Sequence, residues 1–190
     1  MKDLDMQYRP LPIPKEFKDY EMREITVLHK VKVPSFLHDA VIAPIWDMIA
    51  GEGKGAELFV IENITAFDND GNIKDYSRLK LTAGDLYMPN PIVFEEDNKG
   101  GITIYMDADD DNIALMKKDP ERKLDRICYV LIQGDQFYSS FNYKDTREDL
   151  ATYLTHPIDN PKNMHVFVFF CDKEMKHFSP AEYQMMFEEE

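Results

Sequence analysis

The chain has 190 residues, of which 44% are hydrophobic and 12% aromatic, a composition that supports a buried core and excludes a disordered protein. Its 36 acidic residues outnumber 22 basic ones, and the net charge of −14 disfavours direct binding to the phosphate backbone of a nucleic acid. No apolar stretch reaches the roughly 20 residues of a membrane helix, so the sequence predicts a cytoplasmic protein that does not bind a membrane.

Prolines at positions 10, 12 and 14 mark the N-terminal segment, and each proline ring fixes φ and favours an extended chain. Residues 1–20 are therefore predicted to form an extended arm, followed by a single domain over 21–190. The arm matches only part of a polyproline-ligand pattern, because Lys15 stands where the second anchoring proline should be, and the favoured interpretation is that it packs along its own domain or a neighbouring subunit. The residues of the arm expected to contact a partner are Arg9, Pro10, Leu11 and Pro12.

The next segment predicts one strand and one helix. Alternating β-branched residues predict a strand over 24–33. Ser35 is expected to cap a helix that extends to about Ala50, with a kink or a break at Pro44. The glycine-rich segment 51–55 ends the helix and is expected to lead into a strand; its spacing does not match a phosphate-binding loop.

Strand-like segments dominate the middle of the chain, and turn residues such as Asp70-Gly71 separate them. The predicted strands are 56–67, 71–81, 90–96, 101–107, 125–132 and 136–143, and consecutive pairs are expected to form antiparallel hairpins. Phe137, Phe141 and Tyr143 share one face of the last strand. That face is a candidate interaction surface, unless it belongs to the core.

The C-terminal third predicts a short helix over 146–154, a strand over 164–171 that is buried on both faces, and a helix that begins at Ser179. Strands grouped in the middle, with helices near both ends, indicate the α+β class. We expect a single domain with a mainly antiparallel sheet of about six to eight strands, and with three or four helices packed at its ends or on one face.

A cluster of aspartates follows the predicted strand 101–107. Asp107, Asp109 and Asp111 stand at alternate positions, as the first ligands of an EF-hand calcium loop do. Lys118 occupies the position at which such a loop needs its closing carboxylate, and this excludes an EF-hand.

Two interpretations of the cluster remain. Glu95 and Asp97 on the preceding hairpin are able to complete a site for a divalent cation such as Mg²⁺, if the fold brings them close to the aspartates. The favoured interpretation is simpler: one residue of 109–111 caps a short helix over 112–119, and its neighbours stabilise the positive end of that helix.

Nothing in the sequence matches a catalytic motif, and the cysteines, Cys128 and Cys171, lie in apolar segments where a thiol is expected to be buried and inert. The favoured hypothesis is a non-enzymatic binding or accessory protein, of the kind found among inhibitors, immunity factors and proteins of viruses or mobile elements. Its partner is expected to be a protein with a basic surface, or a second copy bound through the arm or a sheet edge. The alternative is a divalent-metal-dependent hydrolase or phosphodiesterase that uses the cluster at 107–111.

Overall fold

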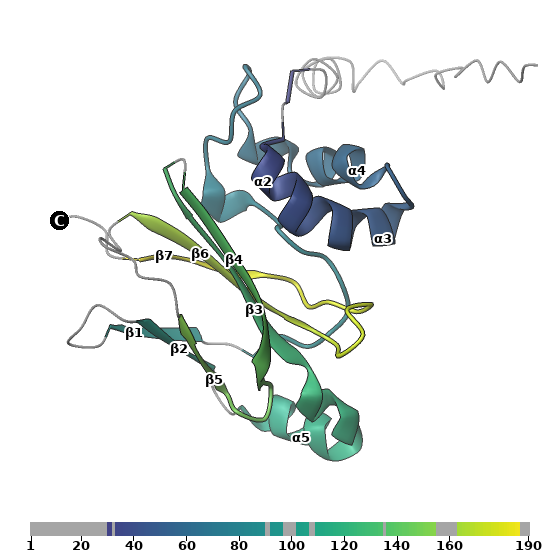
Figure 1. The fold of residues 1–190 in the computed structure, drawn as a ribbon, viewed down its shortest axis with the longest axis vertical. Helices are drawn as coiled ribbons and strands as arrows, with labels where there is room; N and C mark the ends of the chain where they lie inside the picture. The colour runs from purple at the N-terminus through teal and green to yellow at the C-terminus, as the bar shows by residue number, and fades with distance from the viewer. Residues whose placement is uncertain are drawn as a thin grey trace, which may run out of the picture.

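The computed structural model of this protein describes residues 30–31, 33–89, 92–96, 102–106, 109–134, 136–154 and 163–186. Within these ranges the chain forms two antiparallel sheets and several helices, which confirms the predicted α+β class. The strands divide between a four-stranded and a three-stranded sheet, where the sequence led us to expect one (Figure 1). The predicted N-terminal arm and most of the predicted strand 24–33 lie outside the described residues.

The predicted helix over 35–50 forms as one continuous helical segment. It comprises α2 (Ser35–Leu37), the π-helix η2 (His38–Trp46) and α3 (Asp47–Ala50). Pro44 lies inside η2 and does not end the helix there. A proline removes one backbone donor, and a π-helix is a known way for a helix to accommodate an interrupted hydrogen-bond pattern.

The start of this helix differs from the prediction. Pro34 is the N-cap residue, and its carbonyl oxygen accepts hydrogen bonds from the amides of Leu37 and His38 at 3.0 and 3.1 Å. Ser35 is the first helical residue and makes no capping hydrogen bond from its side chain, so its predicted role as cap was wrong.

The segment after the glycine-rich turn is a helix, α4 (Gly55–Glu62), and the predicted strand over 56–67 was wrong. The amide of Gly55 donates a hydrogen bond of 2.7 Å to the Asp47 carboxylate. A side chain at Gly55 would collide with the backbone of Trp46 and Asp47. The close approach of α3 and α4 therefore depends on the absence of a Cβ atom at this position.

A short 3₁₀ helix, η3 (Ile64–Ala66), follows α4. The second strand, predicted over 71–81, was wrong, because this region forms a turn and a 3₁₀ helix, η4 (Tyr76–Arg78). Only an isolated antiparallel bridge between Phe67 and Ile73 forms there. The tight turn between these two residues was predicted correctly: Gly71 has a φ of 85°, and Asp68 accepts hydrogen bonds from the amides of the residues that follow it.

The four-stranded sheet contains β3 (Arg126–Gln133), β4 (Gln136–Thr146), β6 (Met164–Cys171) and β7 (Glu182–Met186) in the order β4-β3-β6-β7. The β3–β4 hairpin and the buried strand β6 match the predictions. β7 stands where the sequence predicted a helix, and it pairs with β6 from Met164 opposite Met186 to Val168 opposite Glu182.

The three-stranded sheet contains β1 (Ile92–Glu96), β2 (Ile102–Met106) and β5 (Ala151–Leu154), with β2 in the middle. The β1–β2 hairpin was predicted, whereas β5 replaces the helix predicted over 146–154. Between β2 and β3 the chain forms α5 (Asp110–Lys118) and the 3₁₀ helix η5 (Pro120–Leu124) at one end of the sheets (Figure 1).

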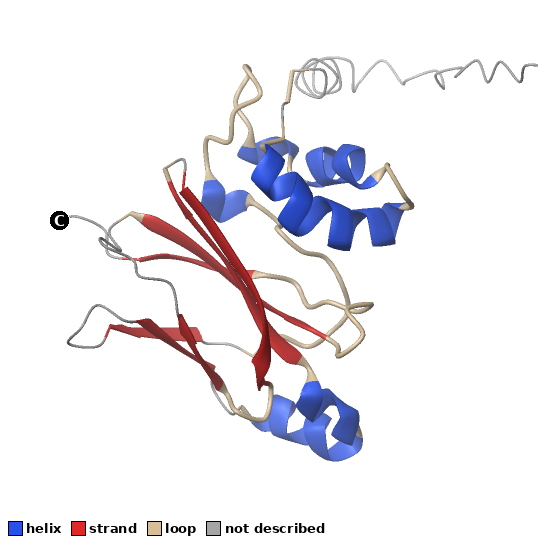
Figure 2. Ribbon diagram, in the orientation of Figure 1, coloured by secondary structure: helices blue, strands red, loops and turns tan. Residues whose placement is uncertain are grey.

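Two apolar clusters cover the two faces of the four-stranded sheet, which is therefore the central layer (Figure 2). On one face, Val130 and Phe167 pack against Trp46 and Phe59 of the helices. On the other face, alternate residues of β3 and β6 pack against the three-stranded sheet. None of the helices in the described ranges is both long and apolar enough to cross a membrane.

Candidate functional site

Asp109 caps α5, as the favoured interpretation of the aspartate cluster predicted. One carboxylate oxygen of Asp109 accepts a hydrogen bond of 2.6 Å from the amide of Asn112, and the other accepts one of 2.7 Å from the Tyr87 hydroxyl. The hydrogen bond to Asp109 is the main cause that raises the pKa of Tyr87 to about 12. Both oxygens of Asp109 are thus engaged within the protein.

The other predicted metal ligands do not meet in the described part of the chain. Asp107 and Asp97 lie outside it, whereas Glu95 on β1 and Asp111 on α5 are exposed. Among the described residues, no group of three or more His, Cys, Asp or Glu side chains is arranged to hold a metal ion. The divalent-cation site at these positions stays a prediction.

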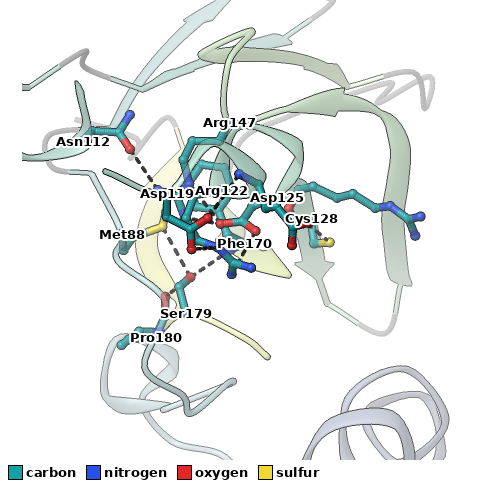
Figure 3. A network of polar contacts seen from close by, with 12 residues as sticks. Met88, Asn112, Asp119, Arg122, Asp125, Cys128, Arg147, Phe170, Ser179 and Pro180 are labelled. Atoms are coloured by element: carbon teal, nitrogen blue, oxygen red, sulfur yellow. Dashed lines mark hydrogen bonds and ion pairs between the residues drawn. The ribbon is translucent and has the colours of Figure 1, made fainter. Parts of the chain in front are cut away.

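A buried ionic network lies at the end of the sheets, beside α5 and η5 (Figure 3). The guanidinium of Arg147 is fully buried, and it contacts one oxygen of Asp125 at 3.2 Å through Nε and through Nη2. Its Nη1 atom donates a hydrogen bond of 2.9 Å to the side-chain oxygen of Asn112, and its Cζ atom lies 3.9 Å from the centre of the Phe170 ring. Arg147 thus joins the end of β4 to α5 and β6.

The second oxygen of Asp125 contacts Nη1 of Arg122 at 3.2 Å, and Arg122 also approaches Asp119 at 3.3 Å. Burial raises the pKa of Asp125, against the opposite effect of the two arginines, and burial also lowers the pKa of Arg147. Since Arg147 and Asp125 are 0% and 1% exposed, neither reaches a substrate in this structure. The network holds α5 and η5 against the sheets.

Ser179 makes a second polar connection beside this network. Its hydroxyl oxygen accepts a hydrogen bond of 2.8 Å from the amide of Phe170, and its carbonyl oxygen accepts one of 2.7 Å from the Thr82 hydroxyl. Ser179 was predicted to start a helix, and instead it ties the segment before β7 to β6.

On the helix side of the central sheet, His165 lies between two tyrosines. Its ring stacks on Tyr76 with the ring centres 4.2 Å apart, and its Nδ1 atom is 2.9 Å from the Tyr183 hydroxyl. Burial lowers the pKa of His165, and the negative charge of Asp75 partly offsets this effect. These contacts with both tyrosines make His165 a packing residue that connects η4 to β6 and β7.

The predicted interaction residues are only partly described. Phe137 is half-buried and packs against the core between the central sheet and the helices. Phe141 and Tyr143 belong to β4, but their side chains lie outside what the structure describes, as do Arg9, Pro10, Leu11 and Pro12. Their role in partner binding stays a prediction.

The three-stranded sheet presents an apolar surface that the sequence did not single out. Alternate residues of its strands point away from the central sheet, and we call this set the outer face: Val93, Glu95, Thr103, Tyr105, Ala151 and Tyr153. Val93, Tyr105 and Tyr153 are 46%, 40% and 46% exposed, whereas Ile102, Ile104 and Met106 on the other side of β2 are buried. The alternation in each strand was visible in the sequence. The sequence did not show which side of these strands a second sheet would cover.

Comparison with known proteins identifies no relative of this chain. No family model matches the chain, and no curated protein and no solved structure is significantly similar to it. The fold and the site therefore define only a class, an α+β protein with two packed antiparallel sheets.

Proposed function

We propose that this chain is a non-enzymatic binding protein of the inhibitor or accessory type, which binds a protein partner with a basic surface through the outer face. The observation that carries the proposal is the exposure of Val93, Tyr105 and Tyr153 side by side on one sheet. Tyrosine is enriched at protein interfaces because it combines a large apolar ring with a polar end.

The charge of the chain favours a basic partner over a second copy. The outer face contains Glu95 but no lysine or arginine, and the whole chain carries a net charge of −14. Two such surfaces would repel each other, whereas a basic rim around an apolar contact would attract this one and accelerate association.

The test compares three proteins as bait for affinity capture from cells that express the chain: the wild type, the Val93→Thr/Tyr105→Thr variant and an Ile49→Gln control. Threonine keeps the strand preference while removing apolar area, and Ile49 is 48% exposed on α3, in the layer opposite the outer face. We expect a basic protein that the wild type and the control recover and the double variant does not.

Binding of that protein is then measured with purified components, and rising salt concentration should weaken it. The proposal fails if the double variant binds the recovered protein as tightly as the wild type does, or if the protein is acidic. It also fails if sedimentation shows that a second copy of the chain occupies the outer face.

A thermal melt with Mg²⁺, Mn²⁺ or Ca²⁺ distinguishes the metal-dependent hydrolase from the non-enzymatic binding protein. A site filled at 100 times its dissociation constant would stabilise the fold by about 2.7 kcal/mol. We expect no shift for the binding protein. A shift that Asp107→Asn abolishes would instead favour the hydrolase.

A further inference from the structure

Two thiols meet inside the central sheet. Cys128 in β3 and Cys171 in β6 are both free and fully buried, and their Sγ atoms are 3.4 Å apart. Cys128 lies opposite Phe169, and Cys171 lies opposite Arg126, so the two cysteines are diagonal neighbours on the helix-facing side of the sheet. The sulfur atoms are therefore already in contact.

The two thiols differ in acidity. The hydrogen bond between them lowers the pKa of Cys171, and the positive charge of Arg126 acts in the same direction. The same hydrogen bond raises the pKa of Cys128 well above its usual value, and burial adds to this effect. Cys171 is also the last residue of β6, next to the turn that the bridge to Phe178 closes, and we assign it as the attacking thiol because the thiolate is the reactive form of cysteine.

A short turn follows Cys171 directly in the chain. Cys171 is the last residue of β6, and a bridge to Phe178 closes the turn 172–177 behind it. The carboxylate of Asp172 holds this turn by accepting a hydrogen bond of 2.8 Å from the amide of Lys176. Small turns at the end of a strand open locally at a lower free-energy cost than the whole fold.

We propose that Cys128 and Cys171 form an oxidisable dithiol, which a peroxide reaches through the turn 172–177 and converts into an intramolecular disulfide. The proposal concerns the central sheet and does not depend on the binding function of the outer face.

The reaction runs in two steps with hydrogen peroxide as the oxidant. The Cys171 thiolate attacks one peroxide oxygen, the O–O bond breaks, and hydroxide leaves and takes up a proton, which gives a sulfenic acid and water. The sulfur of Cys128 then attacks the sulfur of Cys171 and displaces the hydroxyl group as a second water. Two thiols and one peroxide thus give one disulfide and two waters, while the S–S separation closes to about 2.05 Å.

The first experiment treats the folded wild-type protein with hydrogen peroxide, then unfolds it and alkylates every remaining thiol. We expect an intact mass that is lower by two hydrogen atoms, no alkyl group, and a cross-linked peptide pair that contains Cys128 and Cys171. In the Cys128→Ser variant, dimedone should trap a sulfenic acid at Cys171. The proposal is wrong if the oxidised wild type still takes up two alkyl groups, or if it forms only sulfinic acid or intermolecular disulfides.

The second experiment tests the route through the turn. Asp172→Ala removes the side-chain hydrogen bond of the turn and leaves its two backbone hydrogen bonds in place, and the control is Asp68→Ala, since Asp68 accepts similar side-chain hydrogen bonds in a distant turn. We expect the rate of disulfide formation to rise several-fold in Asp172→Ala and to stay at the wild-type value in Asp68→Ala. Equal rates in all three proteins would overturn this route.

Discussion

The ionic network around Arg147 and the outer face depart from the usual distribution of residues in opposite ways. In the network, a guanidinium and a carboxylate are almost completely buried. On the outer face, a valine and two tyrosines remain largely exposed. The charges are compensated within the chain, because each has an oppositely charged partner and further contacts.

The exposed residues of the outer face lie on strands whose opposite sides cover the core. A buried charge that has an oppositely charged partner is accounted for by the fold itself. A group of exposed apolar residues suggests a partner instead. Substitutions should therefore have large effects on stability in the network and small ones on the outer face.

The largest expected effect is that of Arg147→Met. This change leaves the carboxylate of Asp125 buried with only Arg122 beside it, and we expect the free energy of unfolding to fall by about 3–5 kcal/mol. Denaturant unfolding measures this loss of stability. The control is Lys123→Met, which breaks the exposed ion pair with Glu148 and should cost about 1 kcal/mol or less. Equal losses in the two variants would contradict the structural role of the network.

Asp109→Ala should have an intermediate effect. It removes the cap of α5 and the hydrogen-bond acceptor of Tyr87, so we expect a loss of about 0.5–2 kcal/mol. The ultraviolet titration of tyrosine gives a second measure, because the pKa of Tyr87 should fall from about 12 towards its ordinary value. Asp110→Ala, at an exposed position next to the cap, is the control and should leave that titration unchanged.

The pH dependence of stability should reveal the contribution of His165. Burial lowers its pKa in the folded protein, so the folded state favours the neutral ring. The contribution of His165 to stability is therefore complete above its ordinary pKa of 6.5, and it is lost as the pH falls below that value. Unfolding midpoints measured from pH 7.5 to 5 should fall less steeply in His165→Gln. A slope identical to that of the wild type would exclude this residue as the cause.

The smallest expected effect is that of Val93→Thr/Tyr105→Thr on stability. Both side chains are exposed, and threonine suits a strand, so the free energy of unfolding should stay within about 0.5 kcal/mol of the wild type. A much larger loss would show that these residues stabilise the fold, and it would remove the main argument for a binding surface.

Local sequence patterns predicted the elements whose residues alternate, turn or cap in a recognisable way, even where their partners, as for β6, are distant in the chain. The β1–β2 and β3–β4 hairpins, the buried strand β6 and the cap at Asp109 all follow from alternation, turn residues or capping. The wrong predictions occur where contacts between residues distant in the sequence determine the secondary structure. Phe59 and Val60 have strand preference, yet they lie in α4, which packs against η2 through the glycine at its start.

Two predicted helices failed although their start signals were present. Thr146 and Asp149 form the expected contact, with the Thr146 amide 2.8 Å from the Asp149 carboxylate, but Leu150 has a φ of 55° and directs the chain into β5. Ser179 uses its hydroxyl group for the amide of Phe170, so it is not a cap, and β7 pairs with β6. A capping signal thus fixes one local hydrogen bond without fixing the element that follows.

The candidate sites were less predictable than the elements. The cap at Asp109 was found because its partner, Asn112, is close in the sequence. Arg147, Asp125 and Asn112 come from different elements and form no motif, so only the fold brings them together. The outer face could not be predicted for the same reason, because it depends on how the two sheets pack.

The order of strands in the three-stranded sheet has a consequence for folding kinetics. β2 pairs with β1 across a short connection, but Ile102 lies opposite Leu154, and between them the chain passes through α5, η5 and the whole β3–β4 hairpin. Closing so long a loop costs entropy before any contact compensates for it. We therefore expect the two hairpins to form early and β5 to dock last, so that the proposed binding surface becomes complete only when the rest of the molecule has folded.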